Sequence, residues 1–255
     1  DKETAKIQAP YGFDGLVTVK ASVTRTFDNT VMCEATKQLE FKNPNTIVTE
    51  ISNKPLYDIL VDANIIQVVD GYGKLTKSEA GKVSMADLVQ DGKSIFAGNT
   101  SLKSFVEFEW FSSLEVGQMP IEGVEKVYTP NGMFSGCTNL VEIALSDNFK
   151  YSANDMFKGC TNLEAIYGAS QGRLDEDNNP IYTTLSLEYV GDNFASGCTK
   201  LHTCKLSSMV EHIGAQAFKG CKSLNEFNVP SNSNLTLVYS TKDTPFTECE
   251  NIIFT

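Results

Sequence analysis

Cys198 and Cys204 stand six residues apart with His202 between them, and these side chains have the types of a metal or thiol site. A thiolate is a nucleophile and a zinc ligand, and an imidazole binds the same metal. The repeat described below nevertheless places both cysteines in the core and His202 on the surface. His212 lies in neither an HExxH nor a Cys-x-x-Cys motif. We therefore expect no metal ligand and no catalytic residue among them.

Two pairs of carboxylates have the residue types needed for general acid and base catalysis. They are Glu107 with Glu109 and Asp175 with Asp177. Nothing in the surrounding sequence shapes a pocket, so we expect solvated charges. The sequence also has no P-loop, Rossmann fingerprint or nucleophile elbow. These observations predict a protein that is not an enzyme and needs no cofactor.

A glycine-containing stretch at residues 68–83, VVDGYGKLTKSEAGKV, resembles a calcium-binding loop. With Gly73 at the sixth loop position, Glu79 falls at the twelfth, where such loops carry a bidentate carboxylate. Val68 and Tyr72 then occupy the first and fifth positions, which need oxygen ligands. The two carboxylates of the stretch cannot supply six oxygens alone, so we expect a structural loop without metal.

An eight-residue motif recurs through the C-terminal two-thirds of the chain. Its clearest form is MFSGCTNL at 133–140, and we call its fifth residue the Cys position. The Cys positions are separated by 38, 23, 38, 23 and 28 residues, which a 23-residue unit with three insertions explains. A period of about 20 to 29 residues is typical of leucine-rich repeats. The Cys positions are Asn99, Cys137, Cys160, Cys198, Cys221 and Cys249.

This period predicts an α/β solenoid of about six 23-residue turns with a parallel sheet, preceded by a small α+β N-terminal region. After each Cys position the third and sixth residues are mostly apolar, and the sixth and eighth alternate as in a strand with one buried face. The fifth and seventh residues then face outward, and solenoid sheets use such rows for binding. The predicted ligand-binding row is Ser104, Val106, Glu142, Ala144, Ala165, Tyr167, Thr203, Lys205, Glu226 and Asn228.

Five of the seven cysteines occupy the Cys position, so stacking places their side chains on parallel vectors. A disulfide needs Cβ atoms that point at each other, so we expect buried free thiols that pack as small hydrophobic groups. One repeat departs from the register, because Phe194 stands one place early and Ala195 takes the phenylalanine slot. This departure predicts a local distortion near Phe194 or a compensating bulky neighbour.

The chain divides into three predicted regions: a β-rich segment at 1–53, a helical cap at 54–89 that contains the calcium-loop-like stretch, and the repeats at 90–255. Within the cap we expect a helix at 54–66, capped by Ser52 or Asn53, with Pro55 in its first turn. A short helix should begin at Thr76. The predicted strands lie at 16–24, 38–41 and 47–51.

Two insertions between repeats differ in character. The first, within 106–130, is rich in aromatic residues and is expected to pack on the cap. The second, within 168–184, contains RLDEDNNP and is expected to form an exposed acidic hairpin or loop tip.

The charge balance limits the partners of the chain. A net charge of −11 argues against nucleic acid, whose phosphates need clustered Lys and Arg. No apolar run approaches the roughly 18 residues of a membrane span. The chain begins at Asp1 rather than Met, which fits an exported protein whose signal segment has been removed.

The repeats resemble the BspA-like leucine-rich repeat family, whose pattern AF-x-G-C-x-x-L-x-x-I-x-L-P is closely met by AFKGCKSLNEFNVP at 217–230. The stretch DGYGKLTKSEAGKV is similar to the segment that often precedes such repeats. The resemblance implies export, an extracellular or cell-surface location as an outer-membrane lipoprotein, and adhesion to a host or neighbouring-cell surface protein. Membrane anchoring is expected only through a lipid on a segment that precedes Asp1.

Two alternatives to a protein-binding surface stay open. The repeats are also suited to a structural spacer that presents another part. A glycan-binding module is the other alternative, because aromatic rings form stacking platforms for sugars. The candidate rings are Trp110, Phe111, Tyr128 and Tyr167. The chain also ends in an apolar strand at 252–255 that is expected to be able to pair with another chain.

Overall fold

The structure is a computed structural model. It describes residues 15–24, 31–41, 50–51, 53–66, 75–111, 114, 130–170, 173, 175–177, 179, 181–228, 235–237, 244–250 and 252–254. The chain divides into two compact units, Asp1–Thr49 and Glu50–Thr255.

The first unit contains a β-hairpin. β1 (Gly15–Thr24) pairs antiparallel with β2 (Val31–Phe41), and the register shifts between Val23 and Thr24. β-Branched residues that alternate with other types favour such a pairing. The strand predicted at 16–24 is confirmed, and the strand predicted at 38–41 is the end of the longer β2.

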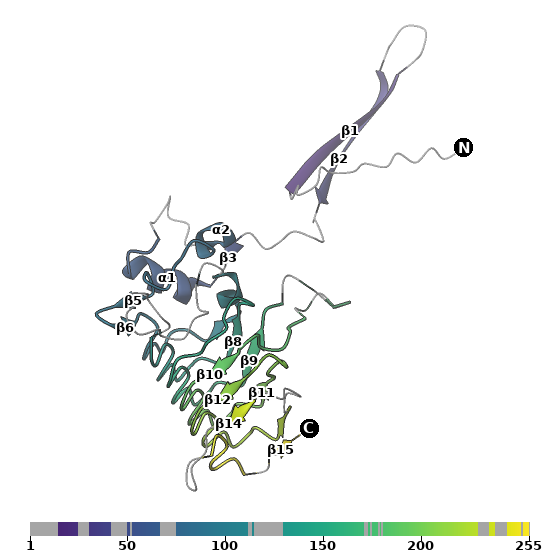
Figure 1. Cartoon of the computed structure of the whole chain (residues 1–255). Coiled ribbons are helices and arrows are strands. Elements are labelled where there is room, and N and C mark those ends of the chain that lie inside the picture. The colour runs from purple at the N-terminus through teal and green to yellow at the C-terminus, as the bar shows by residue number, and fades with distance from the viewer. Residues whose placement is uncertain are drawn as a thin grey trace. The chain divides into compact units, whose positions relative to one another are not determined.

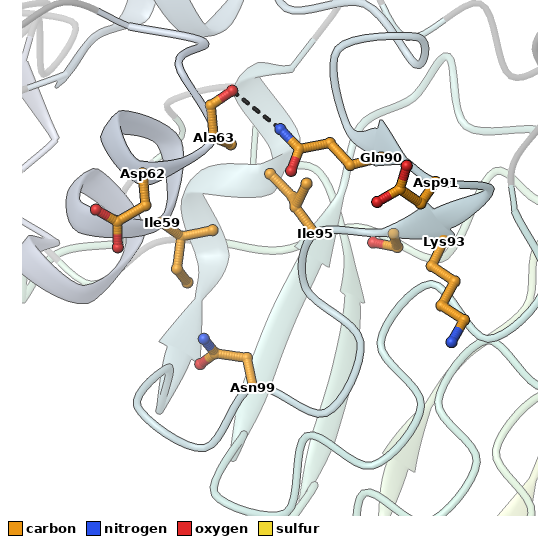
Figure 2. Close-up of a pocket in the computed structure, with 9 residues that line it drawn as sticks. Ile59, Asp62, Ala63, Gln90, Asp91, Lys93, Ile95 and Asn99 are labelled. Carbon is orange, nitrogen blue, oxygen red and sulfur yellow. Dashed lines mark hydrogen bonds between the residues drawn. The ribbon is translucent and has the colours of Figure 1, made fainter.

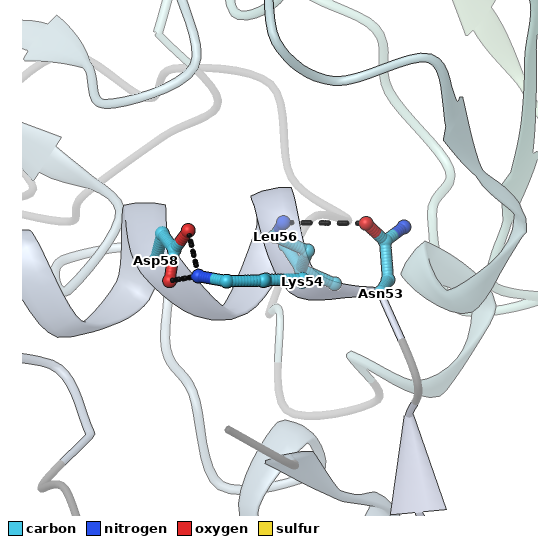
Figure 3. Close-up of polar contacts among 4 residues, drawn as sticks. All are labelled: Asn53, Lys54, Leu56 and Asp58. Carbon is cyan, nitrogen blue, oxygen red and sulfur yellow. Dashed lines mark hydrogen bonds and ion pairs between the residues drawn. The ribbon is translucent and has the colours of Figure 1, made fainter. Parts of the chain in front are cut away.

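The first helix of the second unit is capped by the residue that precedes it. α1 (Lys54–Asp62) follows the N-cap Asn53, whose side-chain oxygen accepts a hydrogen bond from the Leu56 N–H at 3.3 Å (Figure 3). The predicted cap is therefore confirmed. The helix is shorter than the predicted 54–66, because Asn64 adopts a left-handed φ of 56° that a helix cannot continue through.

Short elements complete the cap region. β3 (Glu50–Ile51) pairs antiparallel with β4 (Leu75–Thr76), and α2 (Lys77–Ala80) follows directly, where a short helix was predicted. β5 (Val89–Gln90) and β6 (Lys93–Ser94) form a tight antiparallel hairpin. Residues 68–74 of the calcium-loop-like stretch, which include its first, fifth and sixth loop positions, lie outside the described residues, so its metal-free state stays a prediction.

The repeats form parallel sheets, as the sequence predicted (Figure 1). The strands β7 (Ser104–Phe105), β8 (Glu142–Leu145), β9 (Ala165–Gly168) and β11 (Thr203–Cys204) lie in that order in one sheet. The 3-10 helix η1 (Val106–Trp110) continues the chain directly from β7. β13 (Glu226–Phe227) pairs with β15 (Ile253–Phe254).

A second parallel sheet lies ahead of the repeated motif in three of the turns. It has the order β10 (Tyr189–Val190), β12 (His212–Ile213) and β14 (Thr236–Leu237). Only one sheet was predicted. The structure has more than one because the residues ahead of each motif also adopt paired strand conformation.

Main-chain hydrogen bonds connect each turn to the next. The Gly98 N–H donates to the Ser135 carbonyl at 2.8 Å, and the Gly136 N–H donates to the Lys158 carbonyl at 2.9 Å. The same bond recurs between later turns. A single repeat cannot bury its apolar face, so this stacking supplies both the core and the main-chain partners.

The core is a column of phenylalanine rings along the stack. The rings of Phe96, Phe134 and Phe157 stack with centroids 5.3 Å apart at each step. The early Phe194 meets Phe157 edge-on instead, with ring planes at 87°. Its side chain is fully buried and the adjacent Ala195 N–H still donates to the Ala217 carbonyl. The predicted distortion is therefore absent from the main-chain ladder, because the ring of Phe194 turns to fill the core.

Candidate binding surface

The predicted ligand-binding row follows the sheet β7–β8–β9–β11. Ser104 pairs with Glu142, Glu142 with Ala165, and Ala165 with Thr203, so these four residues lie side by side across the strands. Their pairing places one side chain per strand at the same level. The register therefore brings the outward positions of four turns together.

The row is not exposed along its whole length. Ala144 is fully buried and Ala165 is 2% exposed, so the prediction that both contribute surface is wrong. Their methyl groups do not reach past longer neighbours on the same face, such as Glu142 and Tyr167. The chain also returns to β9 after the second insertion, where the Gly168 N–H donates to the Thr183 carbonyl at 3.0 Å.

Polar and aromatic side chains gather where β7, β8 and β9 meet. The Ser104 hydroxyl donates to a Glu142 carboxylate oxygen at 2.9 Å. The rings of Tyr167 and Tyr182 stack with centroids 4.3 Å apart and nearly parallel planes. We call Ser104, Glu142, Tyr167 and Tyr182 the tyrosine–glutamate centre.

The electrostatics of this centre are negative. Burial first, and then the charges of Glu142 and Glu164, raise the pKa of Tyr167. Burial also raises the pKa of Tyr182, with further contributions from Glu142 and Glu109. Both phenols therefore stay protonated near neutral pH and present hydroxyl donors beside carboxylates.

Glu107 and Glu109 are not solvated charges as predicted. Both are half-buried on η1, and Asn53 Nδ2 donates to Glu107 at 3.1 Å. The Glu109 carboxylate accepts hydrogen bonds from the Ser170 N–H at 2.5 Å and from the Ser170 hydroxyl at 2.9 Å. Burial raises the pKa of Glu107, although hydrogen bonds to its own backbone and to Asn53 act in the opposite direction. These carboxylates connect η1 to the cap and to the end of β9.

The remaining residues of the predicted row differ from the tyrosine–glutamate centre. Lys205 and Asn228 are exposed, and Thr203 and Val106 are half-buried. Glu226 lies on β13, but its side chain lies outside the described part of the structure. The row therefore changes from carboxylates near β8 to a lysine just beyond β11.

The candidate sugar-stacking rings are mostly unsuited to that role. Phe111 is fully buried, and Trp110 packs against the core. One face of Tyr167 is occupied by Tyr182. Tyr128 lies outside the described residues. Among the described candidate rings, none therefore has both of its faces open to a sugar.

A second outward row, which was not predicted, lies on β10 and β12. Tyr189 and His212 are paired in register, and their rings stack at 4.1 Å in planes 1° apart. Tyr151 joins them through a parallel bridge to Tyr189. Burial lowers the pKa of His212, and Asp192 opposes this shift. The sequence contained a signal for this row, because Tyr189 directly precedes Val190, whose side chain is buried, and His212 occupies the paired position in the next turn.

The second insertion ends in an exposed turn, as predicted. Asp175 and Asp177 are both exposed, and the Asp175 carboxylate accepts hydrogen bonds from the N–H groups of Asp177 and Asn179. These bonds lower the pKa of Asp175. The carboxylate therefore holds the turn in shape.

The described cysteines of the repeats are packed within the fold and form no disulfide bonds. Cys137, Cys160, Cys198, Cys204 and Cys221 are free and buried, as predicted, and Cys249 is partly exposed. Burial raises the pKa of Cys204 to about 12, so its thiol is not a nucleophile at neutral pH. His202 is exposed, as predicted, and its Nδ1 lies 3.0 Å from the Thr203 hydroxyl.

Across the described ranges, no group of three or more His, Cys, Asp and Glu side chains is placed to hold a metal ion. In the same ranges, no helix has the length and apolar character needed to cross a membrane.

Comparison with protein families gives one result. The sequence model described as the BspA type leucine rich repeat region matches in six copies, over residues 92–174 and 178–253. These segments cover more than half of the chain. No curated protein and no solved structure gives a significant match.

Proposed function

This chain belongs to the BspA-type leucine-rich repeat family, and we propose that it is a non-enzymatic binding protein of the cell surface. Its ligand is a protein of a host or of a neighbouring cell. The binding surface is the outward row on β7, β8, β9 and β11. One observation carries the proposal: four successive turns place their outward residues in register around the tyrosine–glutamate centre.

The chemistry of this row suits a protein ligand. Tyrosine combines an apolar ring with a hydroxyl group, and it is enriched in protein interfaces for that reason. Tyr167 is held by its stacking on Tyr182, so little conformational entropy is lost when a ligand binds. Glu142 and Lys205 give the two ends of the row opposite charge, which fixes the orientation of a partner.

The cellular location is part of the same proposal. Proteins with repeats of this type are typically associated with bacterial surfaces, and we place this chain outside the cytoplasm as an outer-membrane lipoprotein. The anchor is a lipid on a segment ahead of Asp1. Mass spectrometry of the protein isolated from its own membranes tests this, because a diacylglyceryl cysteine near the N-terminus is expected. An N-terminus without lipid contradicts the anchor.

The binding proposal is tested with defined ligands. Purified full-length chain is applied to panels of extracellular host proteins and of glycans, and the affinity of any protein hit is measured by surface plasmon resonance. Tyr167→Ala and Lys205→Ala should each weaken binding about tenfold. Lys222→Ala is the control, because this exposed lysine lies in a turn, away from the row.

Each outcome of the panels has a distinct meaning. Unchanged affinity of the Tyr167 and Lys205 variants places the site elsewhere on the chain. Binding only to glycans replaces the protein ligand by a sugar, and the stacking of Tyr182 on one face of Tyr167 argues against that result. An absence of binding across both panels favours a structural spacer.

A further inference from the structure

At the repeated motif, main-chain hydrogen bonds run from an N–H group of one turn to a carbonyl of the next turn. The motif carbonyls of the first turn therefore have no preceding motif to donate to them. In every later turn, the carbonyl two residues before the Cys position accepts from the preceding turn, as Ser135 does from Gly98 at 2.8 Å. From the third turn onward, the carbonyl four residues before it also accepts, as Met156 does from the Phe134 N–H at 2.8 Å. These carbonyls therefore point toward the preceding turn.

In the first turn the corresponding carbonyls belong to Ala97 and Ile95. No N–H group of the described residues donates to either of them. No earlier repeat precedes them, and the cap elements α1, β5 and β6 lie there instead. An unpaired carbonyl at the edge of a ladder is a ready acceptor for the main chain of another segment.

A cavity of about 550 Å³ lies at this junction, between α1, the β5–β6 hairpin and the first repeat. Figure 2 shows Ile59 and Asp62 on α1, with Gln90 and Lys93 across from them on the hairpin. Ile95 also lines the cavity. The unpaired carbonyl of Ile95 therefore belongs to a residue of the cavity wall.

The charged side chains of the cavity are mostly acidic. The carboxylates of Asp62 and Asp91 make no ion pair with any described residue, and Lys93 supplies one positive charge against these two. Gln90 uses its Nε2 to donate to the Ala63 carbonyl at 3.0 Å, which leaves its oxygen as the available group. Ile59 and Ile95 add apolar surface. Such a site favours a ligand that carries N–H donors and a positive charge.

We propose that this cavity binds an extended, basic peptide segment of a partner protein. The main chain of the peptide donates to the carbonyls of Ile95 and Ala97, as a preceding repeat would do. Lysine or arginine side chains of the peptide pair with Asp62 on α1 and with Asp91 on the hairpin. This site is separate from the outward row of the sheets, so it does not depend on the function proposed above.

The repeats themselves provide the probe. A synthetic fluorescent peptide with the sequence of residues 153–163, with asparagine in place of Asp155 and serine in place of Cys160, carries the positive charge of Lys158 and contains the Phe157 and Gly159 N–H groups. Within the chain these two groups donate to the next turn. The full-length protein should bind this peptide in fluorescence anisotropy. The same peptide with methyl groups on these two main-chain nitrogens should bind at least about tenfold more weakly.

Protein variants locate the site. Asp62→Arg and Asp91→Arg should each weaken peptide binding about tenfold, because they reverse charges in the cavity. Asp58→Arg is the matched control, since Asp58 lies on the same helix but outside the cavity, paired with Lys54. Carbonyl ¹³C shifts of Ile95 and Ala97 should move when the peptide is added.

The proposal is overturned if the methylated peptide binds as well as the parent. Equal binding by the Asp62, Asp91 and Asp58 variants, with unchanged thermal unfolding, also overturns it. Shifts confined to Tyr167 and Glu142 would assign the peptide to the outward row instead. Binding of glycans but not of the peptide would likewise overturn it.

Discussion

The sulfur of Cys198 lies 3.1 Å from the carbonyl oxygen of Phe157, to which its thiol donates a hydrogen bond across 41 residues of sequence. The thiol of Cys160 makes the same contact with Phe134 at 3.0 Å, and that of Cys221 makes it with Ala195 at 3.2 Å. Each cysteine thus bonds to the carbonyl three residues before the preceding Cys position. The cysteine of the motif is small, apolar and a hydrogen-bond donor, and this site uses all three properties.

A comparison of Cys160 with Cys204 tests this role. In Cys160→Ser, the hydroxyl can donate to the Phe134 carbonyl in place of the thiol. Cys204 is also buried but has no hydrogen-bond partner among the described residues, so Cys204→Ser buries an unsatisfied hydroxyl. We expect Cys204→Ser to lower the free energy of unfolding by about 1 to 2 kcal/mol more than Cys160→Ser. Urea denaturation measures both, and equal losses would show that the thiol bonds contribute nothing specific.

The repeat register predicted some contacts of the candidate surface and could not predict others. The pairing of Ser104, Glu142 and Thr203 follows from the period, because each turn repeats the same neighbours. The contact between Glu109 and Ser170 joins residues 61 apart that belong to no repeated position. No pattern within the sequence reports such a contact, because it depends on how two unique segments pack together.

The burial of Ala144 was unpredictable for a related reason. Alternation along a strand decides which face a side chain occupies, and Ala144 does lie opposite Tyr167 on the outward face. Exposure depends in addition on what the insertions place over that face. Tyr182, which comes from the end of the second insertion, stacks on Tyr167 and could not be assigned to it from the sequence.

Glu248 occupies a position where all five preceding turns carry glycine. Its φ is 63°, and the glycine at the same place in the preceding turn, Gly220, has a φ of 69°. A left-handed conformation costs a residue with a Cβ atom roughly 1 to 2 kcal/mol. Glu248→Gly should therefore raise the free energy of unfolding by about 0.5 to 1 kcal/mol, after the entropy cost of glycine.

Gly220→Ala is the matched test of this strain. A Cβ at Gly220 would have no neighbour closer than 3.9 Å, so any loss reports backbone conformation rather than a clash. We expect a loss of about 1 kcal/mol. The ion pair of Lys219 with Glu248 spans 3.5 Å at the surface, and its removal should cost little. Destabilisation by Glu248→Gly would mean that this pair outweighs the strain.

The exchanged order of Phe194 and Ala195 makes the two sites interdependent. Ala195→Phe alone adds a ring beside the buried Phe194 and should cost about 1 to 3 kcal/mol by overpacking. Phe194→Ala alone leaves a cavity and should cost about 3 to 5 kcal/mol. The double variant restores the Ala–Phe order found at Ala217 and Phe218, so its loss should be smaller than that of Phe194→Ala. Additive losses in the double-mutant cycle would show that the core does not accept the exchange.

Glu107 gives the fold a specific dependence on pH. Burial raises its pKa in the folded chain, so ionisation of this carboxyl opposes folding. This destabilisation of the folded chain is present at neutral pH. It is relieved as the pH falls through the raised pKa of the folded chain, because the folded chain then holds more protons at this site than the unfolded chain. Glu107→Gln keeps an oxygen that can accept from Asn53 Nδ2 but carries no charge.

The melting temperature of Glu107→Gln should therefore exceed that of the unmodified chain at pH 7. The difference should shrink as the pH is lowered, because the raised pKa lets Glu107 of the unmodified chain take up a proton in the folded state. Glu211→Gln, at an exposed site, is the control and should not show this pattern. A lower melting temperature for Glu107→Gln at pH 7 would show instead that its charged hydrogen bond with Asn53 outweighs the cost of burial, and that this bond holds the cap on the first repeat.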